Sequence, residues 1–202
     1  MGKEVTAVFD IGKTNKKFFL FDRDFHEVHR EYTHLESVPD EDGYPSENLQ
    51  ALTAWMRAVL HRALDDPQWD IHTLNFSTYG ASLVHLDNRG EPLTPLYNYT
   101  KPYEPSLEDA FYAKYGPQEA FERHTGASRS GMLNSGLQLY WLKNRQPGTY
   151  SKIKGPCPNA AVSLGDLPVS MVCFEFRRAD SHRVVFPLCT KNCLGFHFSR
   201  PF

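Results

Sequence analysis

The spacing of apolar residues changes along the first third of the chain, and the change predicts strands followed by a helix. Apolar residues run or alternate over 4–10, 16–23 and 26–34, which is typical of β-strands because Val and Phe suit a half-buried, pleated surface. Between Ser46, the expected N-cap, and Pro67 they recur instead at helical spacing. We therefore expect three strands and then one helix that covers a face of their sheet.

The strands that follow predict a mixed sheet of the α/β class. Two further apolar runs, 71–77 and 82–87, come after the helix as the fourth and fifth strands. The order strand-strand-strand-helix-strand favours a sheet with both parallel and antiparallel neighbours, flanked by helices. Trp55 and Trp69 are expected in the core, and His85 in the core or at a sheet edge.

Caps and turn residues divide the rest of the first 150 residues into loops and short helices. The acidic stretch 35–45 is expected to be a solvated loop, as runs of charge usually are. Ser106 predicts a capped helix that breaks at Gly116. A second short helix is expected to end at Thr125, and a third to begin at the cap Ser135.

The composition indicates a globular protein and argues against binding to nucleic acid or insertion into a membrane. The chain has 202 residues, and 41% of them are hydrophobic, which is enough for a globular core. The formal net charge of −2 gives no electrostatic footprint for nucleic acid. No run of 18 apolar residues could span a membrane, and the N-terminus lacks a signal-peptide pattern. A cytoplasmic protein that binds neither nucleic acid nor membrane is therefore expected.

The composition changes abruptly near residue 154. All four cysteines lie after this point, and all ten tyrosines and all three tryptophans lie before it. We therefore divide the chain into residues 1–154 and a tail of different composition, 155–202, which does not continue the pattern of the first part. The leading interpretation of the tail is translation in a shifted reading frame.

Two alternatives to a shifted frame stay open. One is a module that binds zinc through loosely spaced ligands, namely Cys189, Cys193 and His197 with Cys173 or His182. The other is a diverged tail with strands over 169–176 and 182–188, in which the cysteines are inert core residues.

The polar residues between the first two strands carry the most chemistry. Gly12 lets the backbone turn sharply and bring its N–H groups near an anion. The hydroxyl of Thr14 can donate to a phosphate oxygen, and Lys16 or Lys17 supplies positive charge. Asp10 can hold Mg²⁺ through water because that ion prefers carboxylate oxygen. The segment is not a P-loop, and an ordinary hairpin turn has similar residues.

Three stretches, taken in order, resemble the FGGY family of carbohydrate kinases. Asp-x-Gly-x-Thr-x-x-Lys between two strands resembles the first phosphate motif of that family. Residues 76–102 resemble the segment in which two sugar-contacting loops flank a strand and a turn, and 124–147 resemble a helix that packs over the sugar cleft. The resemblance covers about residues 4–154 and implies the N-terminal domain of a ribonuclease H-like, actin-like ATPase fold, incomplete in this chain.

The resemblance also implies a reaction, the ATP-dependent phosphorylation of a sugar with Mg²⁺ as the metal. Asp10 would hold the metal, and Thr14 and Lys17 would stabilise the developing charge. The nucleotide phosphates would be held by Gly12, Thr14, Asn15 and Lys16. The sugar would be held by Thr78, Tyr79 and Ser82 in the first sugar loop and by Asn98 and Lys101 in the second.

The resemblance leaves the sugar open. Some members carry a charged pair or a Met-His pair in the first sugar loop, where this chain has Gly80 and Ala81. Ketopentoses and deoxyketohexoses such as xylulose, fuculose and rhamnulose are compatible with the turn by resemblance.

The resemblance implies, finally, that essential parts are missing from this chain. The general base and the adenosine-binding lobe of the family lie beyond the resembling part, so the 202-residue chain is expected to be inactive alone. The alternatives are a sugar- or phosphate-binding module and one half of a split enzyme. An incomplete fold exposes a sheet edge and apolar surface, which favours association between copies.

Overall fold

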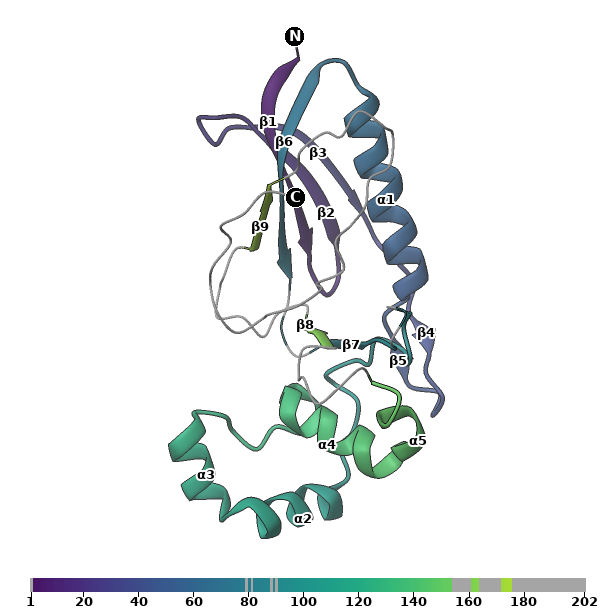
Figure 1. Ribbon diagram of the computed structural model, residues 1–202, viewed down its shortest axis with the longest axis vertical. Coiled ribbons are helices and arrows are strands. Elements are labelled where there is room, and N and C mark those ends of the chain that lie inside the picture. The colour runs from purple at the N-terminus through teal and green to yellow at the C-terminus, as the bar shows by residue number, and fades with distance from the viewer. Residues whose placement is uncertain are drawn as a thin grey trace.

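The computed structural model describes residues 2–78, 80, 82–87, 89 and 91–153, and the backbone of 161–163 and 172–175. Its main sheet has five strands in the order β3-β2-β1-β6-β9 (Figure 1). Their bounds are β1 (Lys3–Ile11), β2 (Lys16–Phe21), β3 (Glu27–Thr33), β6 (Trp69–Thr78) and β9 (Val172–Glu175). Strands β1, β2 and β3 are antiparallel neighbours, whereas β1 and β6 are parallel. The predicted mixed sheet is therefore confirmed.

Helix α1 (Leu49–Asp65) covers one face of this sheet and builds the first core. Every second residue of β1 is buried, from Val5 to Ile11, as strand alternation requires. The ring of Phe9 lies at the centre, where it stacks on Phe76 with a centroid distance of 5.5 Å and meets Trp55 edge to face. The expected core positions of Trp55 and Trp69 agree with this packing.

The start of α1 differs from the prediction. Asn48 is the N-cap, because its Oδ1 accepts from the backbone N–H of Ala51 at 2.9 Å. Ser46 instead belongs to the short strand β5 (Pro45–Ser46), which pairs with β4 (Val38–Pro39). The hydroxyl of Ser46 donates to the carbonyl of Val38 at 2.9 Å. The side chain predicted to cap the helix therefore stabilises the hairpin instead.

The acidic stretch and the fifth strand also differ from the prediction. Most of this stretch, 35–45, belongs to the β4–β5 hairpin (38–46), and Asp40 inside the hairpin is buried rather than solvated. Strand β7 (Leu83–His85) lies outside the main sheet and pairs with β8 (Ala161–Ser163). His85 is buried there, with 1% of its surface exposed.

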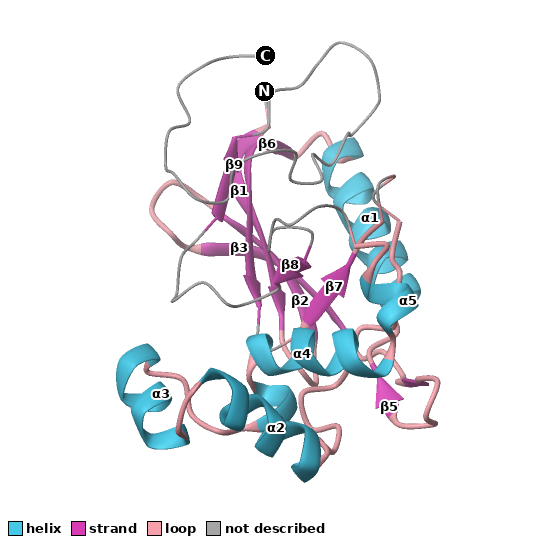
Figure 2. Ribbon diagram, turned by 60° about the horizontal axis from the view of Figure 1, so that its bottom comes forward, coloured by secondary structure: helices cyan, strands magenta, loops and turns pink. Residues whose placement is uncertain are grey.

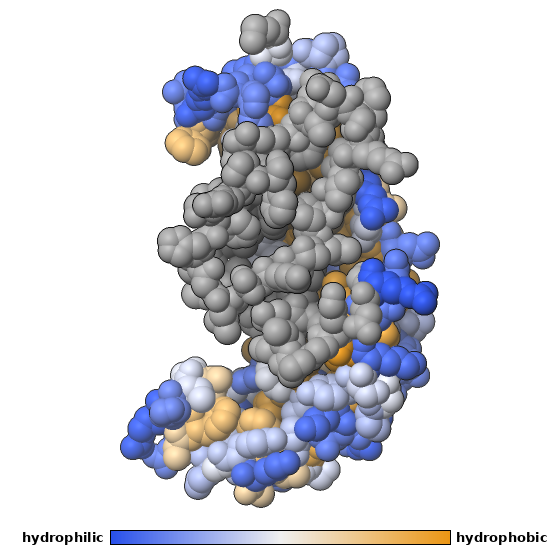
Figure 3. Space-filling view, viewed as in Figure 1, coloured by the Kyte–Doolittle hydropathy of each residue, from blue (hydrophilic) through white to orange (hydrophobic). Residues whose placement is uncertain are grey.

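A helical region follows beyond the lower end of the sheet (Figure 2). Its elements are α2 (Pro105–Tyr115), α3 (Gln118–Thr125), the 3₁₀ turn η1 (Gly131–Leu133), α4 (Ser135–Arg145) and α5 (Pro147–Tyr150). A second core, made of Tyr97, Met132, Trp141 and Leu142, holds it to the preceding loop. Apolar side chains also reach the surface over this region (Figure 3), and Tyr115 is 49% exposed.

The ends of these helices were predicted better than their starts. Helix α2 ends before Gly116, and α3 ends at Thr125 with Gly126 at φ 72°, a left-handed C-cap. Ser106 is not a cap, because α2 begins one residue earlier, at Pro105. Ser135 is not a cap either: Asn134 Oδ1 accepts from the N–H groups of residues 136 and 137.

Most predictions about the tail lie outside the described residues. The strand over 182–188 is among them, and so are four of the proposed zinc ligands, His182, Cys189, Cys193 and His197. Of the fifth, Cys173, the backbone is described, within β9. The backbone of β9 falls within the predicted strand 169–176. None of the helices in the described ranges has the length and apolar character needed to cross a membrane.

Candidate phosphate and sugar site

The candidate site begins where β1 and β6 end. The two strands are parallel, so their carboxyl ends share one edge of the sheet, and Figure 1 shows both pointing toward the helical region. Asp10 is in register with Ser77, and Ile11 with Thr78. The phosphate turn (residues 12–15) and the first sugar loop (77–82) therefore start side by side. Thr78 is half-buried at this edge, whereas Tyr79 lies outside the described residues.

The phosphate turn is a tight four-residue connection between β1 and β2. The N–H of Gly12 donates to the carbonyl of Asn15 at 3.0 Å, which closes the hairpin. A Cβ on Gly12 would lie 2.8 Å from that carbonyl oxygen, so this close approach requires glycine. Thr14 and Asn15 are exposed at the tip. The carbonyl of Thr14 accepts from His34 Nδ1 at 3.0 Å, which ties the tip to the chain after β3.

Asp10 and Lys17 form an accessible pair of opposite charges at the base of this turn. They face each other across β1 and β2, with Lys17 Nζ 3.1 Å from Asp10 Oδ2. Their side chains are 35% and 41% exposed, respectively. A carboxylate that water can reach, next to an ammonium, can bind a hydrated divalent cation and a phosphate together.

Lys16 points to the opposite face of the strand, because successive side chains of a strand alternate. Its side chain is 1% exposed, and its Nζ donates to Glu47 Oε2 and to the carbonyl of Lys13, each at 2.9 Å. From the sequence, Lys16 and Lys17 are equal candidates for the positive charge beside the phosphate, and the structure distinguishes them. Lys16 is engaged inside the molecule, and Lys17 lies at the surface beside Asp10.

Sequence reasoning missed Lys13, which lies on the turn itself. Its Nζ is 2.6 Å from Glu47 Oε1, and its side chain is 33% exposed. Burial raises the pKa of Glu47, but hydrogen bonds from Lys13 and Lys16 outweigh burial and leave the pKa below its ordinary value. The signal that could have found Lys13 is its position between Gly12 and Thr14.

Ser82 and Asn98 lie in less accessible settings than the sequence suggested. Ser82 is 1% exposed, and within the described part of the chain its hydroxyl has no hydrogen-bond partner. Asn98 Oδ1 accepts from the backbone N–H of Thr100 at 3.0 Å and from its hydroxyl at 2.8 Å. This local turn shapes the second sugar loop (95–101) and occupies the amide oxygen of Asn98.

Lys101, the other residue predicted from the second loop, is engaged in a buried ion cluster. Its Nζ donates to Asp40 Oδ2 and to Asp42 Oδ2, each at 2.6 Å. It also lies 5.1 Å from the centroid of the Tyr97 ring and 4.9 Å from that of Trp141. Burial lowers the pKa of Lys101, but the two carboxylates raise it to a net value above normal, so the ammonium stays charged.

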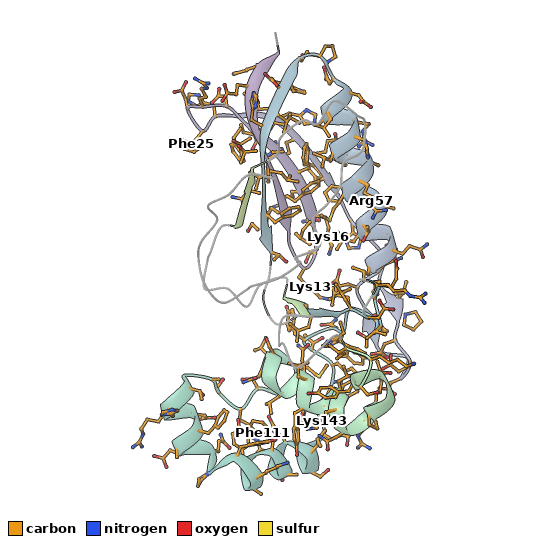
Figure 4. The ribbon with its side chains drawn as sticks, in the orientation of Figure 1. Lys13, Lys16, Phe25, Arg57, Phe111 and Lys143 are labelled. Carbon is orange, nitrogen blue, oxygen red and sulfur yellow. The ribbon has the colours of Figure 1, made fainter. Side chains whose placement is uncertain are left out.

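The second sugar loop nevertheless contacts the phosphate turn. Lys13 Nζ lies 5.8 Å from the centroid of the Tyr99 ring, and the N–H of Glu47 donates to the carbonyl of Leu96 at 3.1 Å. Figure 4 places Lys13 and Lys16 at the lower end of the sheet, where it faces the helical region. The turn, the end of β6 and the second loop therefore surround one edge of the sheet.

Comparison with known proteins identifies a family whose N-terminal domain includes this edge of the sheet. The N-terminal domain of the FGGY family of carbohydrate kinases matches residues 5–164. No curated protein matches the chain. A carbohydrate kinase from Novosphingobium aromaticivorans is similar in structure, with 25% identity and a TM-score of 0.60, over 75% of this chain and 31% of that one.

Two further solved structures show the same fold. A gluconate kinase from Lactobacillus acidophilus has 18% identity and a TM-score of 0.62, over 80% of this chain and 31% of that one. A xylulose kinase from Rhodospirillum rubrum has 19% identity and a TM-score of 0.63, over 74% and 31%. The chain thus spans about a third of the length of these solved kinases.

Proposed function

The chain belongs to the FGGY family of carbohydrate kinases, and on this premise we propose that it carries the phosphate turn and sugar loops of an ATP-dependent kinase. The reaction would transfer the γ-phosphoryl group of ATP to a hydroxyl of a sugar or polyol. The observation that carries the proposal is the shared edge of β1 and β6, where Asp10 and Lys17 lie beside the start of the first sugar loop.

The residues at this edge suit a hydrated magnesium ion and a phosphate. Asp10 offers a half-exposed carboxylate of the type that Mg²⁺ prefers, and it would hold the ion through water. The hydroxyl of Thr14 would donate to a phosphate oxygen, and Lys17 would place positive charge beside it. Bound Mg²⁺·ATP supplies the phosphoryl group and neutralises part of its charge, so the protein contributes mainly positioning and electrostatics.

The sugar side of the proposal rests on the two loops. Thr78 and Tyr79 would contribute contacts from the first loop, and Asn98 from the second. Ser82 is buried, so its hydroxyl would reach a sugar only after the first loop moves. Lys101 is engaged by two carboxylates, so it would act on the sugar through the loop that it holds. The carboxylate that accepts the hydroxyl proton, and the lobe that binds adenosine, belong in this proposal to the part of the kinases that the chain does not span.

A direct test of the phosphate turn uses the 202-residue chain and Mg²⁺·pyrophosphate as a mimic of the nucleotide phosphates. Amide NMR signals of residues 12–15 should shift in a saturable way on titration. Asp10→Asn should weaken binding roughly ten- to a hundredfold, since a charge-assisted contact is worth about 1.5–3 kcal/mol. Asp70→Asn, the same substitution at the opposite end of β6, should bind as the wild type does. Saturable binding without shifts in the turn contradicts the assignment.

The chain alone is proposed to lack kinase activity. ADP release from Mg²⁺·ATP, measured over a panel of ketoses and polyols, should not rise above the sugar-free blank. Turnover with any sugar would overturn this expectation. Saturable sugar binding without turnover would support a binding module, and turnover on mixing with a separately expressed remaining lobe would support a split enzyme.

The origin of the tail is proposed to be a shifted reading frame. Resequencing the gene across codons 145–165 and translating all three downstream frames tests this directly. A second frame that continues the domain and then encodes a nucleotide-binding lobe is the expected result. If no frame does so, the binding module, the split enzyme and the zinc-binding module are favoured instead.

A further inference from the structure

One buried carboxylate lies between the phosphate turn and the second sugar loop. Glu47 precedes the N-cap of α1, and its side chain is 10% exposed. Both of its oxygens are used: Oε1 accepts from Lys13 at 2.6 Å, and Oε2 accepts from Lys16 at 2.9 Å. One residue of the turn and one residue of β2 therefore meet on the same carboxylate.

Lys16 also binds the backbone of the turn. Its Nζ donates to the carbonyl of Lys13 as well as to Glu47, so a single ammonium links the turn's main chain to the carboxylate. A buried ion is tolerated only while its partners are in place, because an uncompensated charge in the interior is costly. The geometry of the turn is therefore tied to the position of Glu47.

The second sugar loop meets Glu47 from the other side. The N–H of Glu47 donates to the carbonyl of Leu96 at 3.1 Å, where the two residues form an isolated β-bridge. The Lys13 ammonium that contacts the Glu47 carboxylate also lies 5.8 Å from the centroid of the Tyr99 ring. Main chain and side chain thus both connect the loop to the same residue.

We propose that Glu47 is a positioning residue that couples the phosphate turn to the second sugar loop, so that a phosphate on the turn changes the loop. The role in catalysis rests on the proposed function, because the turn would hold the phosphoryl donor and the loop would hold the acceptor. Phosphoryl transfer depends on how the two reactants are positioned, so a residue that sets their relation matters without touching either.

The first experiment needs no ligand. Hydrogen–deuterium exchange is measured on the 202-residue chain with Glu47→Gln, and with Glu4→Gln as the control at an exposed ion pair. Glu47→Gln should raise exchange roughly tenfold in both 12–16 and 96–101, with β6 unchanged, because local opening is set by local contacts. Glu47→Asp, which keeps the charge, should restore part of the protection. Increased exchange in only one segment, or throughout β6, overturns the coupling.

The second experiment separates coupling from simple support of the fold. On titration of the wild-type chain with Mg²⁺·pyrophosphate, amide signals of the turn and of 98–101 should shift together. In Glu47→Gln the turn should still shift, but the loop should not. A loop response that survives in Glu47→Gln overturns the proposal. If the turn itself never responds, the proposed phosphate site fails, while the exchange experiment still decides whether Glu47 couples the two segments.

Discussion

Strand alternation decides the role of each side chain around the phosphate turn. Lys16 and Lys17 are the same residue type in adjacent positions, yet one is buried against Glu47 and the other lies beside Asp10. The sequence could predict that a lysine follows the turn, because residue types are visible in it. It could not predict which lysine faces out, because that depends on which face of the sheet α1 covers.

The same substitution should therefore affect binding at Lys17 and folding stability at Lys16. Lys17→Met should change the free energy of unfolding by less than about 1 kcal/mol, because an exposed ion pair contributes little. It should weaken Mg²⁺·pyrophosphate binding. Lys16→Met should lower the free energy of unfolding by about 1–3 kcal/mol, because Glu47 then loses its buried partner and keeps only the partly exposed Lys13. Urea unfolding and the NMR titration measure both effects, and equal stabilities of the two variants would contradict the assignment.

His85 gives a second residue-level prediction, for pH. Burial lowers the pKa of His85 to about 4, and its Nδ1 has no hydrogen-bond partner within the described part of the chain. Below pH 6.5 the unfolded state takes up a proton before the folded state does, so stability falls as pH drops from 6.5 to 4. The loss is about 3 kcal/mol at most, at 1.36 kcal/mol per unit. As pH drops across this window, the denaturant midpoint of the wild type should fall relative to that of His85→Leu; a difference that stays constant would exclude the effect.

At the scale of elements, the order of strands and helices was predictable and the helix starts were not. Three starts were assigned to serines, at Ser46, Ser106 and Ser135. Asparagines cap the first and the third helix, and Glu104 stands at the N-cap position of the second. Ser, Thr, Asn and Asp have similar capping preferences, so a sequence offers several candidates within a few residues and the tertiary path selects one. The sequence also could not predict that β7 lies outside the main sheet, because β7 pairs with β8, which is far away along the chain.

The cap of α4 provides an element-level test. Asn134 Oδ1 accepts from two backbone N–H groups, at 2.9 and 3.2 Å. Asn134→Ala should therefore lower the free energy of unfolding by about 1 kcal/mol. Ser135→Ala, one residue later, should change it by less than about 0.5 kcal/mol. Urea midpoints at constant m-value show which residue caps the helix. A larger loss of stability for Ser135→Ala would mean that Ser135, the residue predicted from the sequence, is the cap.

At the scale of the whole molecule, the sheet and the helical region are connected by charge as well as by apolar contact. Lys101 joins the β4–β5 hairpin, through Asp40 and Asp42, to the second core around Trp141. The family resemblance predicted the fold, and the comparisons confirm it. It could not predict that Lys101 is buried, because its partners lie about 60 residues earlier in the chain.

Lys101→Met should be the most destabilising of these substitutions. The side chain of Asp40 is fully buried, and removing its cation leaves that carboxylate unpaired, at a cost of about 3 kcal/mol or more. Adding Asp40→Asn to Lys101→Met should recover part of the loss. Lys3→Met, at an exposed ion pair with Asp22, is the matched control and should cost less than about 1 kcal/mol. A similar thermal midpoint for both single variants would contradict the structural role.

The parallel pairing of β1 with β6 also has a consequence for the order of folding. The meander β1-β2-β3 is local in sequence, so it can form early, whereas β6 must return to β1 across the whole connection through α1. Closing such a connection costs chain entropy before its contacts form, and non-local contacts slow folding. During synthesis on the ribosome, the edge of β1 stays unpaired until residues 69–78 emerge. An unpaired strand edge favours aggregation, so this interval is one in which a nascent chain is exposed to misassembly.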